Sequence, residues 1–275
     1  RERVEELAQD PTPVYGISTG FGALARRHIP EEMRAQLQLS LVRSHAAGTG
    51  PEVEEEVIRA LMLLRLSTLC TGRTGVRPVV VETYAKALNA GIVPVVREYG
   101  SLGCSGDLAP LAHCALALLG EGEVRVNGKL QDAGEALAAA GIEPLQLREK
   151  EGLALINGTD GMLGQLCLAI TDLRAAAKTA DIATAMTVEG LLGTLVVFAD
   201  DLQQLRPHPG QADAAANILQ VAEGSEILEA ALEEFKKNQV QDAYSVRCAP
   251  QVAGGFRDTL THTAQVAERE LAAAV

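Results

Sequence analysis

The chain lacks tryptophan altogether and has only four phenylalanines and four tyrosines among its 275 residues. Hydrophobic residues still make up 47% of it, so a core must be built mainly from aliphatic side chains. Leu and Ala are plentiful, which favours closely packed helices over a sandwich of sheets. No repeat of about 20 to 50 residues is evident, which excludes a solenoid. The length allows one large core or two smaller ones.

Features that would identify several other classes of protein are also missing. The five cysteines are odd in number and form no Cys-x-x-Cys pair, which argues against a disulfide framework or zinc ribbon and fits a reducing cytoplasm. The net charge is -12 without a basic cluster, so nucleic acid is not an expected partner. We find no signal peptide and no apolar run long enough to span a bilayer, and we expect no membrane partner.

The composition changes near residue 150. Residues 1–150 have the pattern of loops and short elements, whereas residues 151–275 contain long helical patterns. We therefore predict a mainly α-helical (all-α class) protein with an N-terminal domain over 1–150, including short strands and a hairpin, and the first part of a helical bundle over 151–275. The chain begins with Arg1 instead of Met and ends in a helical pattern at Val275, so we expect truncation at both ends.

Hydrophobic periodicity, prolines at helix starts and Gly or Asn at helix ends divide the chain into elements. The helices expected from these signals cover residues 30–44, 51–69, 78–88, 107–119, 133–140, 162–195, 211–221, 226–236 and 252–275. Residues 92–96 are expected to be extended, and an Asn-Gly pair marks the turn of a hairpin within 124–130.

The most informative stretch is 100–111, in which Cys104, Ser105 and Gly106 follow a flexible segment and precede a helix. Such a triad can cyclise when the Gly106 nitrogen attacks the Cys104 carbonyl with loss of water and Ser105 loses its hydroxyl as a second water. The product is an electrophile, which ordinary side chains do not provide. The simpler interpretation makes Ser105 only the N-cap of the next helix, with Asp107 near its positive end.

This stretch closely resembles the signature of the histidine and aromatic amino acid ammonia-lyases. Those enzymes carry a 4-methylidene-imidazol-5-one group (MIO) formed from their own backbone. Most of them have Ala where this chain has Cys104, and the ring uses only backbone atoms of that residue. The resemblance therefore implies that Cys104, Ser105 and Gly106 form an MIO, and that the protein needs neither a metal nor an external cofactor.

A second motif is the glycine-rich segment 14–22, which contains Tyr15. By itself it could be a phosphate-binding loop, or a flexible loop with one packed aromatic. It also resembles the mobile active-site loop of the same family, which implies that Tyr15 is the catalytic base that removes the β-proton of the substrate. A tyrosine needs a pKa well below about 10 for this role.

His45 follows Ser44 at the end of a predicted helix. A histidine there can be a plain C-terminal cap, since its charge suits the negative end of a helix. In the family this position selects the substrate. Ser-His resembles the histidine-type enzymes, whereas phenylalanine-type enzymes have apolar residues, so the resemblance implies that His45 binds the imidazole of the substrate. Tyrosine-type relatives can also carry a histidine nearby.

Two further motifs follow in the order of the family. Asn157 could belong to an ordinary Asn-Gly turn, and the resemblance implies instead that its amide reaches the MIO and the substrate. Tyr244 and Arg247 are three residues apart, so one helical turn would put them on the same face. By themselves they form a surface pair. The resemblance gives Arg247 the substrate carboxylate, Tyr244 a part in proton transfer and Gln241 a place in the pocket lining.

The resemblance covers the chain from about residue 10 onwards and is weaker over 212–237. Members of the family continue with a further helical region that this sequence does not contain. It implies that L-histidine is deaminated to trans-urocanate and ammonia in the cytoplasm by a homotetramer whose subunits share active sites. Two alternatives stay open. One is a tyrosine-type lyase or aminomutase with the same chemistry, and the other is an inactive folded fragment or scaffold.

Overall fold

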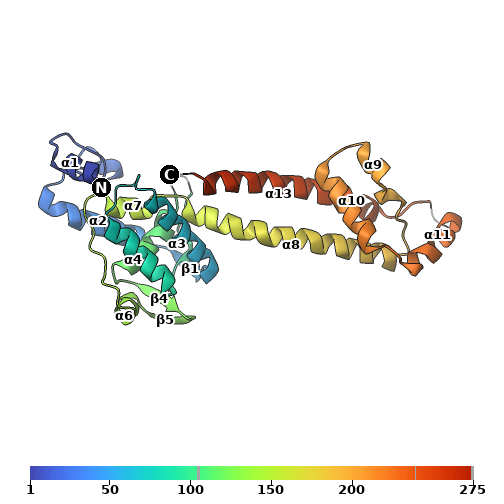
Figure 1. Ribbon diagram of the computed structural model, residues 1–275, viewed down its shortest axis with the longest axis horizontal. Coiled ribbons are helices and arrows are strands. Elements are labelled where there is room, and N and C mark those ends of the chain that lie inside the picture. Colours follow the sequence, from blue (N-terminus) through green and yellow to red (C-terminus); the bar gives the residue numbers. More distant parts are fainter. Residues whose placement is uncertain (104–105, 239, 274–275) are drawn as a thin grey trace. The chain divides into compact units, whose positions relative to one another are not determined.

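The computed structural model describes residues 1–103, 106–238 and 240–273, and of residues 235–238 it describes only the backbone. Over these residues the protein is mainly α-helical with five short strands, as predicted (Figure 1). The chain divides into two compact units. Unit 1 comprises Arg1–Leu166 with Glu270–Val275, and unit 2 comprises Cys167–Arg269. The domain boundary near residue 150 was drawn from composition and stays a prediction.

Unit 1 is built from short helices and strands. In chain order its elements are α1 (Glu2–Gln9), the 3-10 helix η1 (Gly22–Leu24), α2 (Glu31–His45), β1 (Thr49–Glu52), α3 (Glu55–Cys70), α4 (Pro78–Asn89), β2 (Ile92–Pro94), β3 (Arg97–Tyr99), α5 (Leu108–Leu118), β4 (Glu123–Val126), β5 (Lys129–Asp132), α6 (Ala133–Ala139), α7 (Glu151–Ile156) and the start of α8 (Asp160–Gly190). Pro78 opens α4 because its fixed φ suits a first helical turn, where the missing N–H is not needed.

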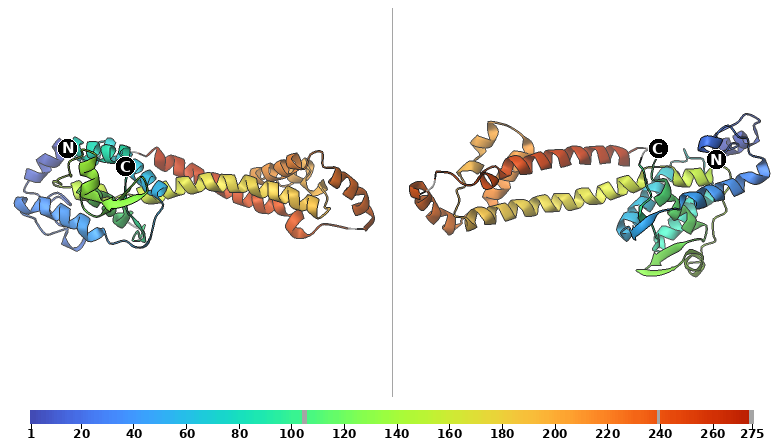
Figure 2. Two further views of the ribbon diagram at one scale, coloured as in Figure 1. Left: turned by 90° about the horizontal axis from the view of Figure 1, so that it is seen from below. Right: turned by 180° about the vertical axis from the view of Figure 1, so that it is seen from behind.

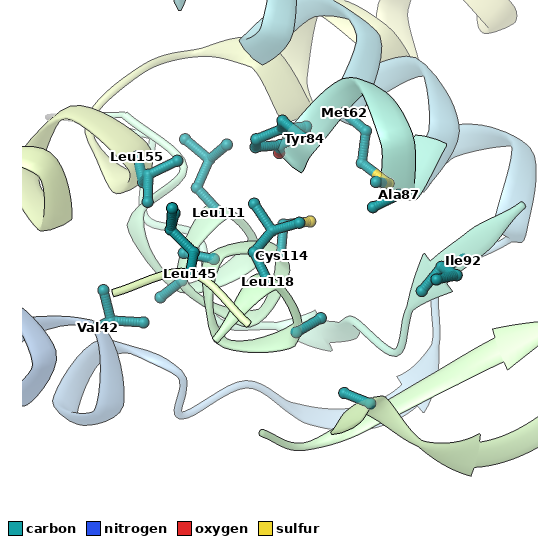
Figure 3. Close-up of a cluster of buried hydrophobic side chains, with 14 of the residues drawn as sticks. Val42, Met62, Tyr84, Ala87, Ile92, Leu111, Cys114, Leu118, Leu145 and Leu155 are labelled. Carbon is teal, nitrogen blue, oxygen red and sulfur yellow. The ribbon is translucent and has the colours of Figure 1, made fainter. Parts of the chain in front are cut away.

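The core of unit 1 is aliphatic, with α5 at its centre. Helices α2, α5 and α7 pack on one another, and α3 packs on α4. Figure 3 shows Leu111, Cys114 and Leu118 of α5 among side chains from the surrounding helices, including Tyr84 and Leu155. Each fully buried leucine of this kind contributes about 1.5–3 kcal/mol relative to an exposed one. The low content of aromatic residues is therefore compensated by close packing of small and branched side chains.

A three-stranded antiparallel sheet in the order β2-β4-β5 lies in unit 1. The predicted hairpin is its β4–β5 pair, in which Val126 is opposite Lys129. Asn127 and Gly128 between them have φ values of 51° and 75°, the left-handed geometry that makes Asn-Gly the preferred two-residue turn.

A second sheet was not predicted. Strand β1 pairs with β3 in antiparallel fashion, with Thr49 opposite Tyr99. The expected helix over 51–69 therefore begins late, at Glu55. The reason is that Pro51 is compatible with an edge strand, and Val53 donates its N–H to the Val96 carbonyl at 2.9 Å instead of entering the helix.

Unit 2 contains the longer helices. Its elements are the rest of α8, the 3-10 helix η2 (Val196–Phe198), α9 (Asp200–Gln204), α10 (Pro209–Val221), α11 (Glu226–Asn238), α12 (Tyr244–Arg247) and α13 (Ala249–Leu271). Within this unit α13 runs beside α8 (Figures 1 and 2), and Arg257 of α13 donates to the Ala177 carbonyl of α8 at 3.1 Å. A second core contains Val188, Phe198 and Ile218.

Helix α8 differs from its prediction in two respects. It spans Asp160–Gly190 and stops before the expected end at residue 195. The helical run Glu151–Gly190 is also long and apolar enough, by length and composition, to cross a membrane, which corrects the expectation that no such run exists. A core helix of a soluble protein passes the same test, so this observation is weak evidence for a membrane span.

Glu151 is a fully buried carboxylate at the start of α7. It accepts two hydrogen bonds at 2.8 Å from the guanidinium of Arg77, and the backbone N–H groups of Arg77 and Arg148 donate to it at 3.0 and 2.8 Å. Burial alone would raise the pKa of Glu151, but these hydrogen bonds outweigh burial and hold the pKa below its ordinary value. The carboxylate thereby ties α7 to the start of α4.

We expect Glu151→Gln to lower the free energy of unfolding by about 3 kcal/mol at neutral pH, because the Arg77 guanidinium loses its counter-charge. In the parent protein this contribution is present above about pH 4.3 and is lost as the pH falls further, since the native carboxylate has the lower pKa. Denaturation followed by circular dichroism between about pH 7 and 2.5 measures both effects. The exposed residue Glu143 supplies the control, Glu143→Gln, and equal stability of the two variants would contradict this role.

Candidate active site

The backbone of Gly106 lies directly against the turn that contains Asn157. A Cβ at position 106 would lie only 2.4 Å from the carbonyl oxygen of Gly158, and Gly106 has a φ of +102°, so glycine alone fits there. The N–H of Asp107 donates to the same carbonyl at 2.6 Å. The structure therefore brings the triad motif and the Asn-Gly motif together.

The buried side chain of Asp107 connects the segment before the triad to the start of α8. Its Oδ1 accepts from the Ser101 hydroxyl at 2.7 Å and its Oδ2 accepts from the Met162 N–H at 2.9 Å. Asp107 is also the N-cap position of α5, which begins at Leu108. The simpler interpretation of the triad, with Ser105 as the N-cap, is therefore wrong, because the helix starts too late for it.

Cys104 and Ser105 lie outside the described residues. The glycines on either side of them, Gly103 and Gly106, form an isolated antiparallel bridge. Gly103 has a φ of +72°, and a Cβ there would lie 3.3 Å from the sulfur of Met162. The flanks of the triad are thus close to each other and packed on the start of α8. In the described part of the chain, no three His, Cys, Asp or Glu side chains are placed to hold a metal ion.

The glycine-rich segment 14–22 is anchored by a buried amide. Gln38 of α2 donates to the Gly16 carbonyl at 3.4 Å, and its Oε1 accepts from the Leu153 N–H at 3.2 Å. A Cβ at Gly16 would lie 2.8 Å from the Leu153 side chain, so this glycine allows close contact with α7. Since α7 ends at Ile156, the anchor connects the loop of Tyr15 to the helix that precedes Asn157.

Tyr15 itself is 52% exposed. Its hydroxyl accepts from the Gly22 N–H at 3.3 Å, and its ring meets Phe21 edge-on with 6.0 Å between the ring centres. The backbone near Tyr15 is therefore fixed, whereas about half of the side chain remains accessible to a ligand.

His45 is the last residue of α2, one residue beyond the predicted end of this helix. Its Nδ1 lies 2.9 Å from the Leu41 carbonyl oxygen and 3.1 Å from the Ser44 hydroxyl. Because a carbonyl only accepts, Nδ1 of the neutral ring carries the proton and Nε2 is an acceptor. The two interpretations of His45 are thus compatible: one ring nitrogen closes the helix, and the other can contact a ligand.

His113 of α5 holds the segment that follows His45. Its Nε2 accepts from the Gly48 N–H at 3.1 Å. Gly100, in the triad stretch, also approaches this segment, since a Cβ at position 100 would lie 3.2 Å from the Gly48 Cα. The segments that carry His45 and the triad are therefore in contact through two glycines. Burial chiefly, and then the charge of Arg97, lower the pKa of His113.

Gln241, Tyr244 and Arg247 form a second group, which lies in unit 2. The Arg247 guanidinium is 5.7 Å from the centre of the Tyr244 ring, as the three-residue spacing predicts, and it donates to Oε1 of Gln241. The carboxylate of Asp242 accepts from the Thr194 N–H at 2.9 Å and so anchors the segment before α12. Tyr244 is 69% exposed.

Among the described residues, the predicted site residues thus belong to two units, with Tyr15, His45, Gly106 and Asn157 in unit 1 and Gln241, Tyr244 and Arg247 in unit 2. Sequence reasoning missed several polar residues that hold their segments in place, namely the buried Gln38, Arg65 and Asp160 and the half-buried His113 and Asp242, and it gave Asp107 only a place at the helix end. A polar residue inside an apolar helical stripe was the available signal, most clearly for His113 between the alanines and leucines of α5.

The model of the aromatic amino acid lyase family matches residues 1–275, and the chain belongs to this family. A histidine ammonia-lyase of Streptomyces avermitilis is 63% identical over 273 residues, which are 99% of this chain and 53% of that protein. The histidine ammonia-lyase of Sorangium cellulosum is 47% identical over 265 residues, 96% of this chain and 51% of that protein. The chain spans about half the length of these curated relatives.

Solved structures of the family share the fold. The histidine ammonia-lyase from Trypanosoma cruzi is 38% identical with a TM-score of 0.83, covering 99% of this chain and 49% of that one. The tyrosine aminomutase from Streptomyces globisporus is 41% identical with a TM-score of 0.88, covering 99% of this chain and 54% of that one. The mainly helical fold predicted from the sequence is therefore the fold of this family.

We expect the stability of the protein to fall as the pH drops below about 6.5, because a protonated His113 cannot accept from Gly48. The sign follows from the lowered pKa: below the ordinary pKa of histidine the unfolded chain binds more protons than the native one. In His113→Gln the amide oxygen can still accept and does not titrate, so this dependence should disappear. The loss in the parent should be about 1 kcal/mol, the contribution of one hydrogen bond.

Urea denaturation between about pH 7.5 and 5.5 measures this difference. His28→Gln is the matched control, since His28 is an exposed histidine of the same unit. A parent protein whose stability did not change over this range would contradict the prediction, and so would a His113→Gln variant that kept the parent's pH dependence.

Proposed function

We propose that this protein carries the MIO-forming part of a histidine ammonia-lyase, which converts L-histidine to trans-urocanate and ammonia. The contact of Gly106 with the Asn157–Gly158 turn carries the proposal, because it joins the two motifs whose chemistry the reaction needs. The 63% identity to the Streptomyces avermitilis protein named histidine ammonia-lyase supports histidine as the substrate.

The described residues fit an MIO formed from Cys104, Ser105 and Gly106. The close approach of Gly158 restricts position 106 to glycine, whose amide nitrogen is the least hindered nucleophile. When formed, the group supplies an electrophilic carbon that makes the substrate amine a better leaving group. The N-terminus of α5 follows the triad directly, and its positive end favours negative charge that develops nearby. In this proposal neither a metal nor an external cofactor takes part.

The residues of unit 1 take the proton and orient the amino acid. Tyr15 removes the β-proton, a role that its exposed position on an anchored loop supports. The amide of Asn157 offers a donor and an acceptor, which suits the zwitterionic substrate. Its side chain is exposed, while its backbone carbonyl is held by Arg65 at 2.9 Å.

The residues of unit 2 bind the other end of the substrate. Arg247 holds the carboxylate with its planar fork of donors, Tyr244 assists proton transfer and Gln241 lines the pocket. The contacts among these three residues support a common role. We further propose that the enzyme is a cytoplasmic homotetramer in which a neighbouring subunit contributes this group to each active site.

His45 gives the preference for histidine. Its Nδ1 is committed to the Leu41 carbonyl, so Nε2 can accept a hydrogen bond from the imidazole N–H of the substrate. A tyrosine-type enzyme is the second candidate, favoured by the likeness to the tyrosine aminomutase structure. The phenol hydroxyl of a tyrosine substrate can also donate to Nε2, so this hydrogen bond does not distinguish the two candidates. They differ in how well the pocket fits an imidazole or a phenol ring.

We expect Ser105→Ala to reduce urocanate formation at least about a thousandfold, because the electrophile supplies most of the rate enhancement. Intact-mass measurement gives an independent result: the parent should be lighter than its sequence by two waters, and the variant cannot lose the second one. Ser40→Ala, at an exposed serine of α2, is the control. Urocanate formed by Ser105→Ala at the parent rate would disprove the mechanism.

We expect His45→Phe to lower the ratio of kcat/KM for histidine to kcat/KM for phenylalanine at least about tenfold, since the variant loses the acceptor and gains apolar surface. Product formation from histidine, phenylalanine and tyrosine, measured in parallel, also decides between the two candidates. An unaltered ratio would remove the assignment of His45, and a parent that prefers tyrosine would favour the second candidate.

A further inference from the structure

A buried ion pair lies beneath the Asn157–Gly158 turn. Arg65 of α3 and Asp160, the first residue of α8, are 3% and 6% exposed, and Nη1 of Arg65 is 3.4 Å from Oδ2 of Asp160. The same Nη1 donates to the Asn157 carbonyl at 2.9 Å. The Thr68 hydroxyl donates to the other carboxylate oxygen at 3.5 Å. The pair therefore links α3, the turn and α8.

The turn is held between this pair and the triad. A Cβ at Gly158 would lie 2.4 Å from the Asp160 carboxylate and 2.5 Å from Nη1 of Arg65. The carbonyl of the same residue meets Gly106 and accepts from the Asp107 N–H. Only the backbone of Gly158 therefore separates the ion pair from Gly106. The position of the ion pair thus sets how closely the turn approaches Gly106.

The pair is poorly suited to a purely stabilising role. Nε of Arg65 and Oδ2 of Asp160 are buried without a hydrogen-bond partner, and burial raises the pKa of Asp160 despite the attraction of Arg65. Replacing a buried ion pair with uncharged residues of similar volume is often neutral or stabilising. Because Arg65 donates to the Asn157 carbonyl, the position of the pair indicates a role in holding the Asn157–Gly158 turn.

We propose that Arg65, paired with Asp160, is a positioning residue that presses the Asn157–Gly158 turn onto Gly106 and thereby promotes cyclisation of the triad. The inference rests on the proposed function, since it concerns the formation of the MIO. In the step concerned, the Gly106 nitrogen bonds to the Cys104 carbonyl carbon. The carbonyl oxygen leaves as water with the N–H protons of Gly106 and Ser105, and a carbon–nitrogen double bond forms. Ser105 then loses its Cα proton and hydroxyl as a second water.

The proposal predicts that stability and maturation can be separated. In the double variant Arg65→Met/Asp160→Asn no buried charge is left unpaired, so the fold should survive with a midpoint of thermal unfolding equal to or above that of the parent. The Asn157–Gly158 turn, however, loses the hydrogen bond from Arg65 to the Asn157 carbonyl that holds it against Gly106. Loss of the two waters should then be on the order of tenfold to a hundredfold slower, because a displacement of about 1 Å has effects of this size on an intramolecular reaction.

The experiment follows intact mass at intervals after a short pulse of expression, together with thermal unfolding of each purified protein. Arg59→Met, at an exposed arginine of the same helix, is the matched control and should mature at the parent rate. Arg65→Lys keeps the charge beside Asp160 but moves the donor away from the position of Nη1, so it should mature at an intermediate rate. It also serves as the test variant if the double variant does not fold.

The outcomes separate this inference from the proposed function. If the parent loses two waters and a folded double variant, or a folded Arg65→Lys variant, loses them at the same rate, the role of Arg65 is disproved while the proposed function stands. If the parent chain never loses water, both fail together. Slow maturation at unchanged stability, with intermediate behaviour of Arg65→Lys, would support the role, since a merely structural residue would change both quantities.

Discussion

The close approach of two backbone segments is the constraint on which the rest of unit 1 depends. Gly106 and Gly158 are so near each other that a single methyl group at position 106 would overlap a carbonyl oxygen. One segment contains the last residue of the triad and the other follows α7, so their contact has to be produced by packing of distant parts of the chain. The aliphatic core around α5 brings the segments together, and the glycines let them touch.

Buried and half-buried polar side chains fix segments that the apolar core brings together. Gln38 and His113 each bond to a backbone group of an irregular segment, at Gly16 next to Tyr15 and at Gly48 shortly after His45. Asp107 accepts from the Met162 N–H in the first turn of α8, the helix that follows Asn157. Apolar contacts could bury the same segments but could not fix the direction of their N–H and carbonyl groups. A buried polar group without a partner costs about 1–3 kcal/mol, so each of these bonds penalises alternative loop positions.

The sequence predicts the local parts of this structure well and the non-local parts poorly. The Asn-Gly hairpin, the proline start of α4 and the end of α2 at His45 follow from short-range chemistry. The β1–β3 sheet was missed because its pairing joins segments far apart in the chain, and Pro51 resembles a helix start when it is read alone. Arg65 was missed for a similar reason: nothing near it in the sequence shows that its partners are a turn and a carboxylate more than ninety residues away.

The proposed enzyme carries out two kinds of chemistry with different groups of residues. In the proposed enzyme, cyclisation uses backbone atoms of residues 104–106 and the support of Gly158, Asp107 and Arg65, all of which belong to unit 1. In the same proposal, turnover also uses Tyr15 of unit 1 and Arg247 and Tyr244 of unit 2. A defect in the residues that support cyclisation should therefore change the mass of the protein and its activity together, whereas a defect in a residue that binds or deprotonates the substrate, such as Tyr15 or Arg247, should change only activity. Mass and turnover measured on the same sample thus assign a residue to one of the two tasks before its geometry in the assembled enzyme is considered.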